Sequence, residues 1–312
     1  MIDMMRITLS LLICFGLTAC DPQHTDPDEG PGQANARVTV ITSNYPLYYF
    51  AGQIASGLSS EVIIKLPDID GDPANWKPDS AAIAELQAAD LVVLNGVGYE
   101  AWRSWVTLPE NLLLDTSRGF TDRLIPLQNE TVHQHGPAGE HSHKGHAFTV
   151  WLDPQLAAEQ ARSIHQALSR LLPGNDELLN SNLASLSEKL EQLDQAQEEA
   201  FGQLGSNTLL FSHPVYQYLR ARYRIDGVSV HWEPGEMPAT RDWLELGKIL
   251  ASDRAELMLW EDTPLEETRS RLLDLGIRSI PFRTASNRPA QGDYLDVMQN
   301  NVNRLAELAH TP

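Results

Sequence analysis

The sequence predicts an α/β protein of two lobes, each a doubly wound parallel sheet, joined by one long rigid helix. Strand patterns alternate with helix patterns in both halves of the chain, which is the arrangement of parallel sheets. Between the halves, leucines recur at spacings of four and three residues, the period of an amphipathic helix. The length of 312 residues fits two domains of roughly 100–150 residues each.

The composition is that of a globular protein. Hydrophobic residues make up 42% and charged residues 21%, which excludes a disordered chain, collagen and a membrane protein with several spans. Asp and Glu number 42 against 23 Lys and Arg, and the formal net charge is −19. Because a surface this acidic repels phosphate backbones, we expect no nucleic-acid partner.

The first 36 residues have the pattern of a signal peptide followed by a tether. Residues 1–19 contain the apolar run Ile7–Phe15, which is typical of a removable secretory signal and too short for a permanent membrane span. They lead into Leu-Thr-Ala-Cys, which resembles a bacterial lipobox, so we expect a lipid on Cys20. The alternative is an ordinary signal with an incidental cysteine. Residues 20–36, rich in Pro, Gly and Asp, would form a flexible tether.

This N-terminus predicts a periplasmic protein that is anchored to a membrane by lipid. Asp21 directly after Cys20 is similar to the signal that retains Gram-negative lipoproteins at the inner membrane. The one other cysteine, Cys14, lies within the signal, so the mature chain would contain no free thiol and no disulfide.

Residues 37–173 are predicted to form the N-terminal lobe. Its last helix has a good cap in Asp153 and a favourable first residue in Pro154. The predicted strands are Val38–Thr42, Glu61–Leu66, Leu91–Leu94 and Leu112–Leu114, and the predicted helices are Leu47–Leu58, Ser80–Ala89 and Pro154–Leu172.

A histidine-rich segment, residues 129–147, interrupts the strand–helix alternation. It has no apolar period and holds five of the ten histidines, so we interpret it as a loop. This density of imidazoles is a compositional signal for metal binding; the alternative is a polar insertion whose histidines are incidental. The candidate ligands are His141 and His143, followed by His133, His135 and His146.

Residues 174–204 are predicted to link the two lobes, with a helix over Asp176–Leu204 on the order of 40 Å long. Residues 205–312 would form the C-terminal lobe. Its predicted strands are Thr208–Ser212, Val228–Val230, Glu256–Trp260 and Ser279–Phe282, and its predicted helices are Val215–Tyr223, Thr240–Leu250, Leu265–Leu275 and Tyr294–Ala309.

Three metal-competent side chains come directly after predicted strands of this second lobe. His213 follows one strand, His231 the next and Glu261 the third, with Glu233 two residues beyond His231. Ligands bind beyond the carboxyl ends of parallel strands, and imidazoles with a carboxylate suit Zn²⁺ and similar ions. The alternative reading of each is structural: a hydrogen-bonded histidine, or a glutamate that caps a turn.

Enzyme motifs do not appear: the chain has no G-x-S-x-G, H-E-x-x-H or P-loop, and no G-x-G-x-x-G after the first strand. We therefore expect a protein that is not an enzyme.

Nearly all of residues 38–308 resembles the substrate-binding proteins of zinc/manganese ABC transporters, the cluster A-I family. The motifs that carry the resemblance are TSNYPLYYFA, DPANWKPDSAAIAELQAADLVVLNGVGYEAW, VWLDPQLAAEQA, FSHPVYQYLRARYRI and GDYLDVMQNNVNRLAEL. The resemblance implies two α/β lobes joined by one long helix, and a histidine-rich loop like that of the zinc-specific members.

The resemblance also implies a function. The chain would capture a divalent ion, Zn²⁺ ahead of Mn²⁺ or another metal, and deliver it to an ABC permease in the inner membrane that a cytoplasmic ATPase drives. Its chemistry would be coordination alone, and we expect a monomer.

The sequence departs from the family at three of its four metal positions. The first family histidine falls at Ala74, the second at Thr149, and the last carboxylate near Phe282, where this chain has none. Only His213 matches directly. Either the site has moved, with His213 joined by His231, Glu261 and one or two loop histidines, or the pocket has lost its metal. We favour the moved site.

Two other hypotheses remain. A metal-independent binder of a small solute could use a pocket lined by Tyr45, Trp76 and Trp232. A zinc hydrolase could use Glu233 or Glu261 as a general base, and it would need three ligands and an open coordination position.

Overall fold

The structure, a computed structural model, describes residues 37–127, 131–134, 140–143, 145–204 and 208–309. All of these belong to one compact unit that spans Ala36–Pro312. The predicted signal peptide, the lipid site Cys20 and the tether lie outside the described residues. No helix in the described part of the chain is both long enough and apolar enough to cross a membrane.

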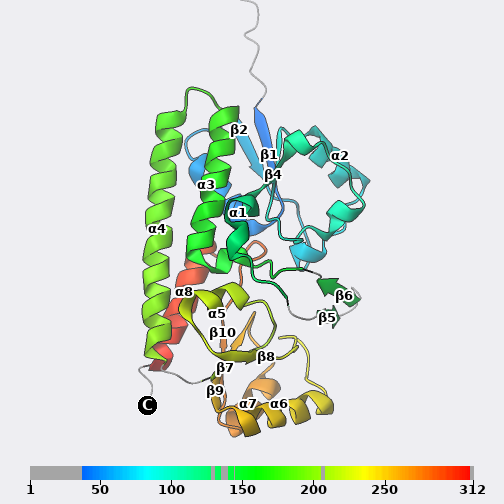
Figure 1. Ribbon diagram of the computed structural model, residues 1–312, viewed down its shortest axis with the longest axis vertical. Coiled ribbons are helices and arrows are strands. Elements are labelled where there is room, and N and C mark those ends of the chain that lie inside the picture. Colours follow the sequence, from blue (N-terminus) through cyan, green and yellow to red (C-terminus); the bar gives the residue numbers. More distant parts are fainter. Residues whose placement is uncertain (1–36, 128–130, 135–139, 144, 205–207, 310–312) are drawn as a thin grey trace, which may run out of the picture. The chain divides into compact units, whose positions relative to one another are not determined.

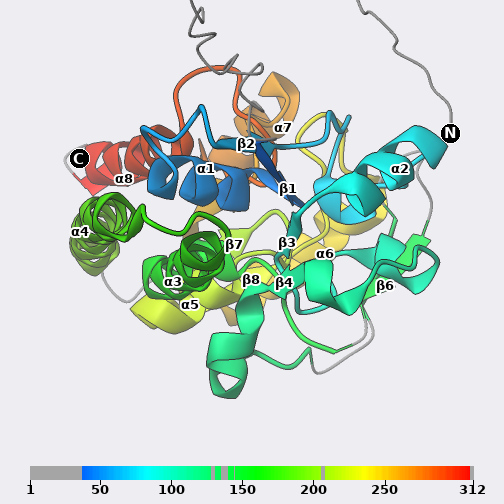
Figure 2. The same cartoon turned by 90° about the horizontal axis from the view of Figure 1, so that it is seen from above.

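The first sheet has four parallel strands in the order β2-β1-β3-β4, as the alternating pattern predicts. Successive residues of β1 face opposite sides of the sheet: Val40 packs with α1 and α3 (Pro154–Leu171), and Ile41 packs with α2. Helices α1 and α3 lie on one side of this sheet and α2 on the other (Figure 2). The elements are β1 Val38–Thr42, α1 Tyr45–Ile54, β2 Val62–Lys65, α2 Ser80–Ala88, β3 Leu91–Leu94 and β4 Leu113–Asp115.

Helix α1 is shorter than predicted. The Asn44 side chain caps its start by accepting from the Leu47 N–H, and Pro46 stands in its first turn. The prediction carried it to Leu58, but the helix ends at Ile54. The chain then turns through Gly57, whose φ of +89° lies in the left-handed region that glycine adopts easily.

The histidine-rich segment is not the plain loop that its composition predicted. Within it, β5 (Thr131–Gln134) and β6 (Glu140–His143) form an antiparallel hairpin (Figure 1). Position 133 pairs with position 141, and position 131 with position 143. Polar strands of four residues carry no apolar alternation, which is the signal that sequence reasoning relies on.

Two long antiparallel helices follow, α3 (Pro154–Leu171) and α4 (Asp176–Gln203), and they pack against each other. Asp153 accepts from the N–H groups of Gln155 and Leu156, so the predicted cap of α3 is confirmed. The predicted stripe of α4 is buried at Leu179, Leu186, Leu190, Leu193 and Ala200, while Leu183 and Leu204 are half-buried.

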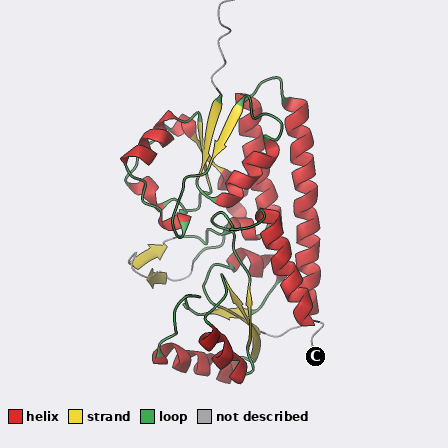
Figure 3. Cartoon of the chain, turned by 180° about the vertical axis from the view of Figure 1, so that it is seen from behind, coloured by secondary structure: helices red, strands yellow, loops and turns green. Residues whose placement is uncertain are grey.

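The second sheet is also parallel, in the order β10-β9-β7-β8. Figure 3 shows the strands of both sheets in yellow, with the second sheet in the lower half of the picture. Its strands agree with the predicted runs within two residues at each end. The elements are β7 Thr208–Phe211, α5 Gln217–Tyr223, β8 Gly227–Ser229, α6 Thr240–Ser252, β9 Ala255–Trp260, α7 Glu266–Asp274, β10 Arg278–Pro281 and α8 Tyr294–Ala309.

The segment between β10 and α8 returns to the first lobe. The Thr284 carbonyl accepts from the Trp151 indole N–H at 2.7 Å, and the Tyr294 hydroxyl donates to the Trp151 carbonyl at 2.7 Å. The Tyr45 N–H donates to the Ser286 carbonyl at 3.1 Å. One hydrophobic core therefore runs through both sheets, with α1, α3, α4 and α8 packed into it.

Glu100 is a buried carboxyl group at the carboxyl edge of the first sheet. It is 6% exposed and accepts from the Ser43 hydroxyl at 2.6 Å, the Asn95 N–H at 2.6 Å and the Gly96 N–H at 3.1 Å. Burial raises the pKa of Glu100 to about 7, and the three hydrogen bonds oppose that rise only in part.

This burial predicts a pH-dependent stability. A carboxyl group whose pKa is higher in the folded state stabilises the fold fully at low pH, and that contribution is lost as pH rises through about 7. The free energy of unfolding of the wild type, relative to Glu100→Gln, should therefore fall between pH 5 and pH 7.5. Chemical denaturation across this range measures it. Glu191→Gln, which removes an exposed carboxylate of α4, is the matched control for net charge. If the free energy of unfolding falls with pH equally steeply in Glu100→Gln and Glu191→Gln, the raised pKa does not belong to Glu100.

Candidate metal centre

The candidate metal residues follow three adjacent strands of the second sheet. His213 comes two residues after β7, His231 two residues after β8, and Glu261 directly after β9. Because β7 lies between β9 and β8, the parallel pairing brings the three carboxyl ends together with His213 in the middle. The sequence prediction that these strand ends share one edge is confirmed.

His213 lies between two carboxylates. Its Nε2 is 3.3 Å from Oε1 of Glu233, and its Nδ1 is 3.3 Å from Oε1 of Glu261. The His231 ring stands nearly perpendicular to it, with the ring centroids 6.2 Å apart. The imidazole is 5% exposed, while the two glutamate side chains are 30% and 31% exposed. The cluster is therefore buried at the histidine and open to solvent at the carboxylates.

The chemistry of this cluster suits a cation. A neutral imidazole has one donor nitrogen and one acceptor nitrogen, so it can donate to only one of two flanking carboxylates. The other nitrogen carries a lone pair that can bind a metal ion. A histidine that binds a metal through one nitrogen and donates to a carboxylate through the other is a common arrangement in zinc sites.

The distances also match those of a zinc site. Zinc bonds to nitrogen and oxygen of about 2.0–2.1 Å place two tetrahedral ligand atoms roughly 3.3 Å apart. The Nε2–Oε1 separation of 3.3 Å between His213 and Glu233 has this value. Even so, no group of three or more His, Cys, Asp or Glu among the described side chains could hold a metal ion as it stands. A third ligand would have to move toward His213.

The family positions that lack ligands here have structural roles. Ala74 is 1% exposed and lies in a short 3₁₀ helix that Asp72 caps. The Thr149 hydroxyl donates to the Val215 carbonyl. Phe282 is fully buried, and its carbonyl accepts from the Tyr216 hydroxyl at 2.8 Å.

The histidines of the hairpin are placed only in part. Positions 133 and 141 face each other in the ladder, and 143 is two residues along the same strand as 141. His135 lies outside the described residues. His146 is exposed, and its backbone forms an isolated bridge with Pro126. The predicted roles of these histidines as ligands remain predictions.

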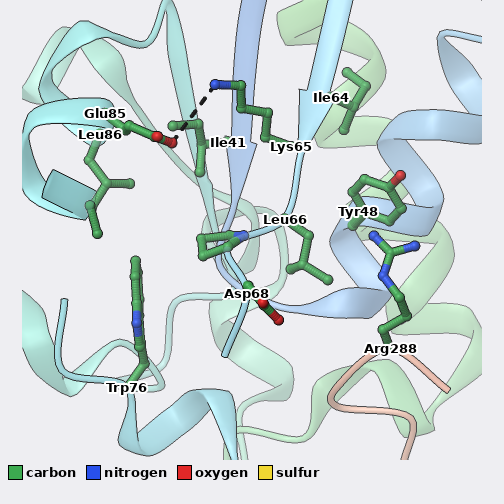
Figure 4. A pocket seen from close by; sticks show the side chains of 12 residues that line it. Ile41, Tyr48, Ile64, Lys65, Leu66, Asp68, Trp76, Glu85, Leu86 and Arg288 are labelled. Carbon is green, nitrogen blue, oxygen red and sulfur yellow. Dashed lines mark ion pairs between the residues drawn. The ribbon is translucent and has the colours of Figure 1, made fainter. Parts of the chain in front are cut away.

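The aromatic pocket of the solute-binder hypothesis does not form from the three residues named for it. Trp76 lines a cavity of about 330 Å³ at the carboxyl end of β2, together with Tyr48, Lys65 and Arg288 (Figure 4). Tyr45 stacks on Tyr48 outside that lining. Trp232 packs in a separate core cluster with Trp243 and Trp260.

Sequence reasoning missed a group of arginines near Glu261. Arg283, Arg288 and Arg304 line a second cavity together with Glu261 and Asp262. These arginines are spread over 22 positions of a loop and a helix, and no spacing rule relates them.

The fold and this cluster define a two-lobe α/β binding protein with a candidate metal centre at a strand-end edge. Residues 40–308 match the family described as "Zinc-uptake complex component A periplasmic" (ZnuA). The chain belongs to this family, so the predicted resemblance is confirmed.

Curated relatives are distant but align over most of the chain. The chain is 25% identical over 315 residues to the "Zinc-binding lipoprotein AdcA" of Streptococcus pneumoniae (strain ATCC BAA-255 / R6), covering 96% of this chain and 60% of AdcA. It is 23% identical over 306 residues to the "High-affinity zinc uptake system protein ZnuA" of Bacillus subtilis (strain 168), covering 94% of each. The chain thus spans only about 60% of the length of AdcA.

Solved structures share the fold. The metal-dependent lipoprotein YcdH from Bacillus subtilis superposes with a TM-score of 0.72 at 21% identity, covering 87% of this chain and 98% of that one. The Zn(II)-bound ZnuA-like domain of Streptococcus pneumoniae AdcA gives 0.72 at 20% identity, covering 88% and 100%. The predicted fold class, two parallel α/β lobes with a long helix between them in sequence, is confirmed.

Proposed function

We propose that this protein captures zinc and delivers it to an ABC-type importer. The observation that carries the proposal is the cluster in which Glu233 and Glu261 flank His213 at the carboxyl ends of parallel strands. Membership of the zinc-uptake family supports it, as do the names of the relatives, which are zinc-binding and zinc-uptake proteins. The protein is a binder and not an enzyme.

In the proposed centre, His213 is the fixed ligand. It is nearly fully buried, so its ring loses little freedom when an ion binds. Glu233 and Glu261 are already within 3.3 Å of its two nitrogens, and His231 is the next nearest imidazole. Ion entry would draw one carboxylate and His231 together around one nitrogen, while the other carboxylate keeps the ring oriented.

The hairpin supplies the remaining ligands in this proposal. Alternate residues of a strand share a face, so positions 133, 141 and 143 belong to one face of the hairpin ladder. The segment leads into Trp151, a buried residue three positions before α3, whose indole donates to the Thr284 carbonyl and so holds the end of the segment near the second lobe. His143 and His141 lie nearer that fixed point along the chain than His133 and would lose less chain entropy on binding.

The cellular setting is proposed on the same basis. Cys20 would carry a lipid that holds the protein at the periplasmic face of the inner membrane, with Asp21 as the retention signal. The partners would be an ABC permease and its ATPase, and the protein would act as a monomer. The relative from Streptococcus pneumoniae is named a lipoprotein, which supports the anchor.

Replacing His213 by Ala should weaken zinc binding by about a hundredfold or more, because the ion loses a buried nitrogen ligand. A hundredfold loss of affinity corresponds to about 2.8 kcal/mol of binding free energy. Calorimetric titration of chelator-stripped protein measures the affinity. His165→Ala, on α3, is the matched control and should bind like the wild type. A wild type that binds no zinc, or a His213 variant of full affinity, would overturn the proposal.

Deleting residues 133–146 should also weaken tight zinc binding by roughly a hundredfold, because the ion would keep only the strand-end ligands and water. A full-length variant with all five hairpin histidines changed to Asn separates lost ligands from a lost hairpin. Single replacements should rank His143 and His141 above His133. If the loop-deleted protein binds zinc at full affinity, the hairpin is an accessory segment and the moved site is wrong.

Cys20→Ser should release the protein from membranes into the soluble periplasmic fraction and leave zinc affinity unchanged, because it removes the anchor and no ligand. Fractionation followed by immunodetection measures this. A Cys20→Ser protein that still sediments with membranes contradicts the lipid anchor.

A further inference from the structure

A cavity of about 550 Å³ opens beside Glu261, between the end of β9, the loop after β10 and helix α8. We call it the arginine cavity. Its charged lining consists of Arg283, Arg288 and Arg304 with Glu261 and Asp262. It therefore has one more positive than negative side chain, in a chain whose net charge is −19. A locally positive cavity on an acidic protein selects anions.

A buried asparagine holds the backbone of Arg283 and the guanidinium group of Arg304, and Asp262 holds the guanidinium group of Arg283. Asn301 is fully buried, and its Oδ1 accepts from the Arg283 N–H at 3.0 Å and from Nη1 of Arg304 at 3.4 Å. Its Nδ2 donates to the Arg283 carbonyl at 2.8 Å. Nε and Nη2 of Arg283 donate to Oδ1 of Asp262 at 3.0 and 2.6 Å. Both guanidinium groups are thus positioned before any ligand arrives, which lowers the entropy cost of binding.

The two guanidinium groups lie close enough to act on each other. Burial lowers the pKa of Arg304, and the charge of Arg283 lowers it further. Two cations that repel each other gain from an anion placed between them. Arg288 extends the positive side toward the first lobe, where its guanidinium stands 4.7 Å from the ring centre of Tyr48 (Figure 4).

The loop that carries Arg288 is tied to the other lobe. Ser286 and Thr284 accept from groups of the first lobe, and the Asn287 side chain donates to the Ile69 carbonyl at 2.7 Å. Ala285 adopts a φ of +54°, the left-handed region that costs a non-glycine residue energy. The loop therefore keeps its shape through contacts with both lobes, and the cavity it covers is preformed.

We propose that the arginine cavity binds a small polycarboxylate anion, so that zinc is captured together with an anionic chelator. Guanidinium groups pair with carboxylates through two parallel hydrogen bonds, and three arginines around one cavity match an anion with several carboxylates. The volume exceeds what a single inorganic phosphate would fill. The joint capture of zinc and the anion rests on the proposed zinc function. Anion binding in the arginine cavity does not depend on it.

Glu261 joins the two sites. Its Oε1 lies 3.3 Å from Nδ1 of His213, and its side chain also lines the arginine cavity. Without a metal, this carboxylate repels an anion in the cavity. With zinc at the His213 cluster, the anion can supply oxygen ligands that the family positions Ala74 and Thr149 do not. Zinc and the anion should therefore strengthen each other's binding by the same factor.

Citrate is the probe, titrated by calorimetry into chelator-stripped protein and into zinc-loaded protein, with retained zinc measured in parallel. Zinc loading should tighten citrate binding at least tenfold while the zinc stays on the protein. Arg304→Gln should weaken citrate binding about tenfold or more in both forms. Arg288→Gln, at an exposed residue whose loss does not threaten folding, should weaken it as well.

The controls separate this cavity from general charge effects. Arg269→Gln removes an exposed arginine of α7 and should leave citrate binding unchanged. Glu261→Gln should strengthen citrate binding to the metal-free protein and abolish the gain from zinc. Three results would each overturn the proposal. They are a citrate affinity unchanged in both Arg304→Gln and Arg288→Gln, a phosphate affinity equal to that of citrate, and removal of zinc from the protein by citrate.

The two proposals fail in different ways. Zinc binding that persists while citrate binding is absent contradicts the arginine cavity alone. Citrate binding to the metal-free protein that depends on Arg304, without any zinc binding, contradicts the zinc function and supports the anion site.

Discussion

The parallel pairing of β7 with β8 and β9 is the constraint on which the candidate site depends. Parallel strands end at the same edge of a sheet, so residues far apart in the chain meet there. His213, Glu233 and Glu261 span 49 positions, yet both glutamates lie 3.3 Å from the imidazole between them. A buried histidine between two half-exposed carboxylates attracts a cation, and the net charge of −19 on the whole chain does not oppose one.

The two lobes are held together by more than the long helix. A hydrophobic core runs through both sheets, and the segment from Arg283 to Tyr294 makes hydrogen bonds to the first lobe. The buried Asp194 of α4 forms an ion pair with Arg222 of α5, with Nη2 and Oδ2 2.5 Å apart. Burial would raise the pKa of Asp194, but the hydrogen bonds from Arg222 and Tyr223 outweigh it and lower that pKa. With these contacts we expect small motions on binding, confined to side chains and the hairpin.

The sequence predicted the fold well because its strands are short apolar runs between helices with clear caps. Asp153 and the leucines of α4 are examples in which one local rule decides the structure. Reasoning failed where the signal is not local. The hairpin β5–β6 has polar strands, and the end of α1 depends on the turn at Gly57. The strand-end rule found His213 and Glu261, with Glu233 as a further carboxylate in reach, but the contact of Glu233 with Nε2 depends on the turn after β8, which has no sequence period.

A crystal structure of the zinc-bound protein, with anomalous scattering measured at the zinc edge, tests the central claim most directly. The account predicts a zinc ion about 2.0–2.1 Å from a nitrogen of His213, with a carboxylate oxygen of Glu233 or Glu261 among its other ligands. A zinc ion bound only by hairpin histidines, with His213 still held between both glutamates, would contradict it.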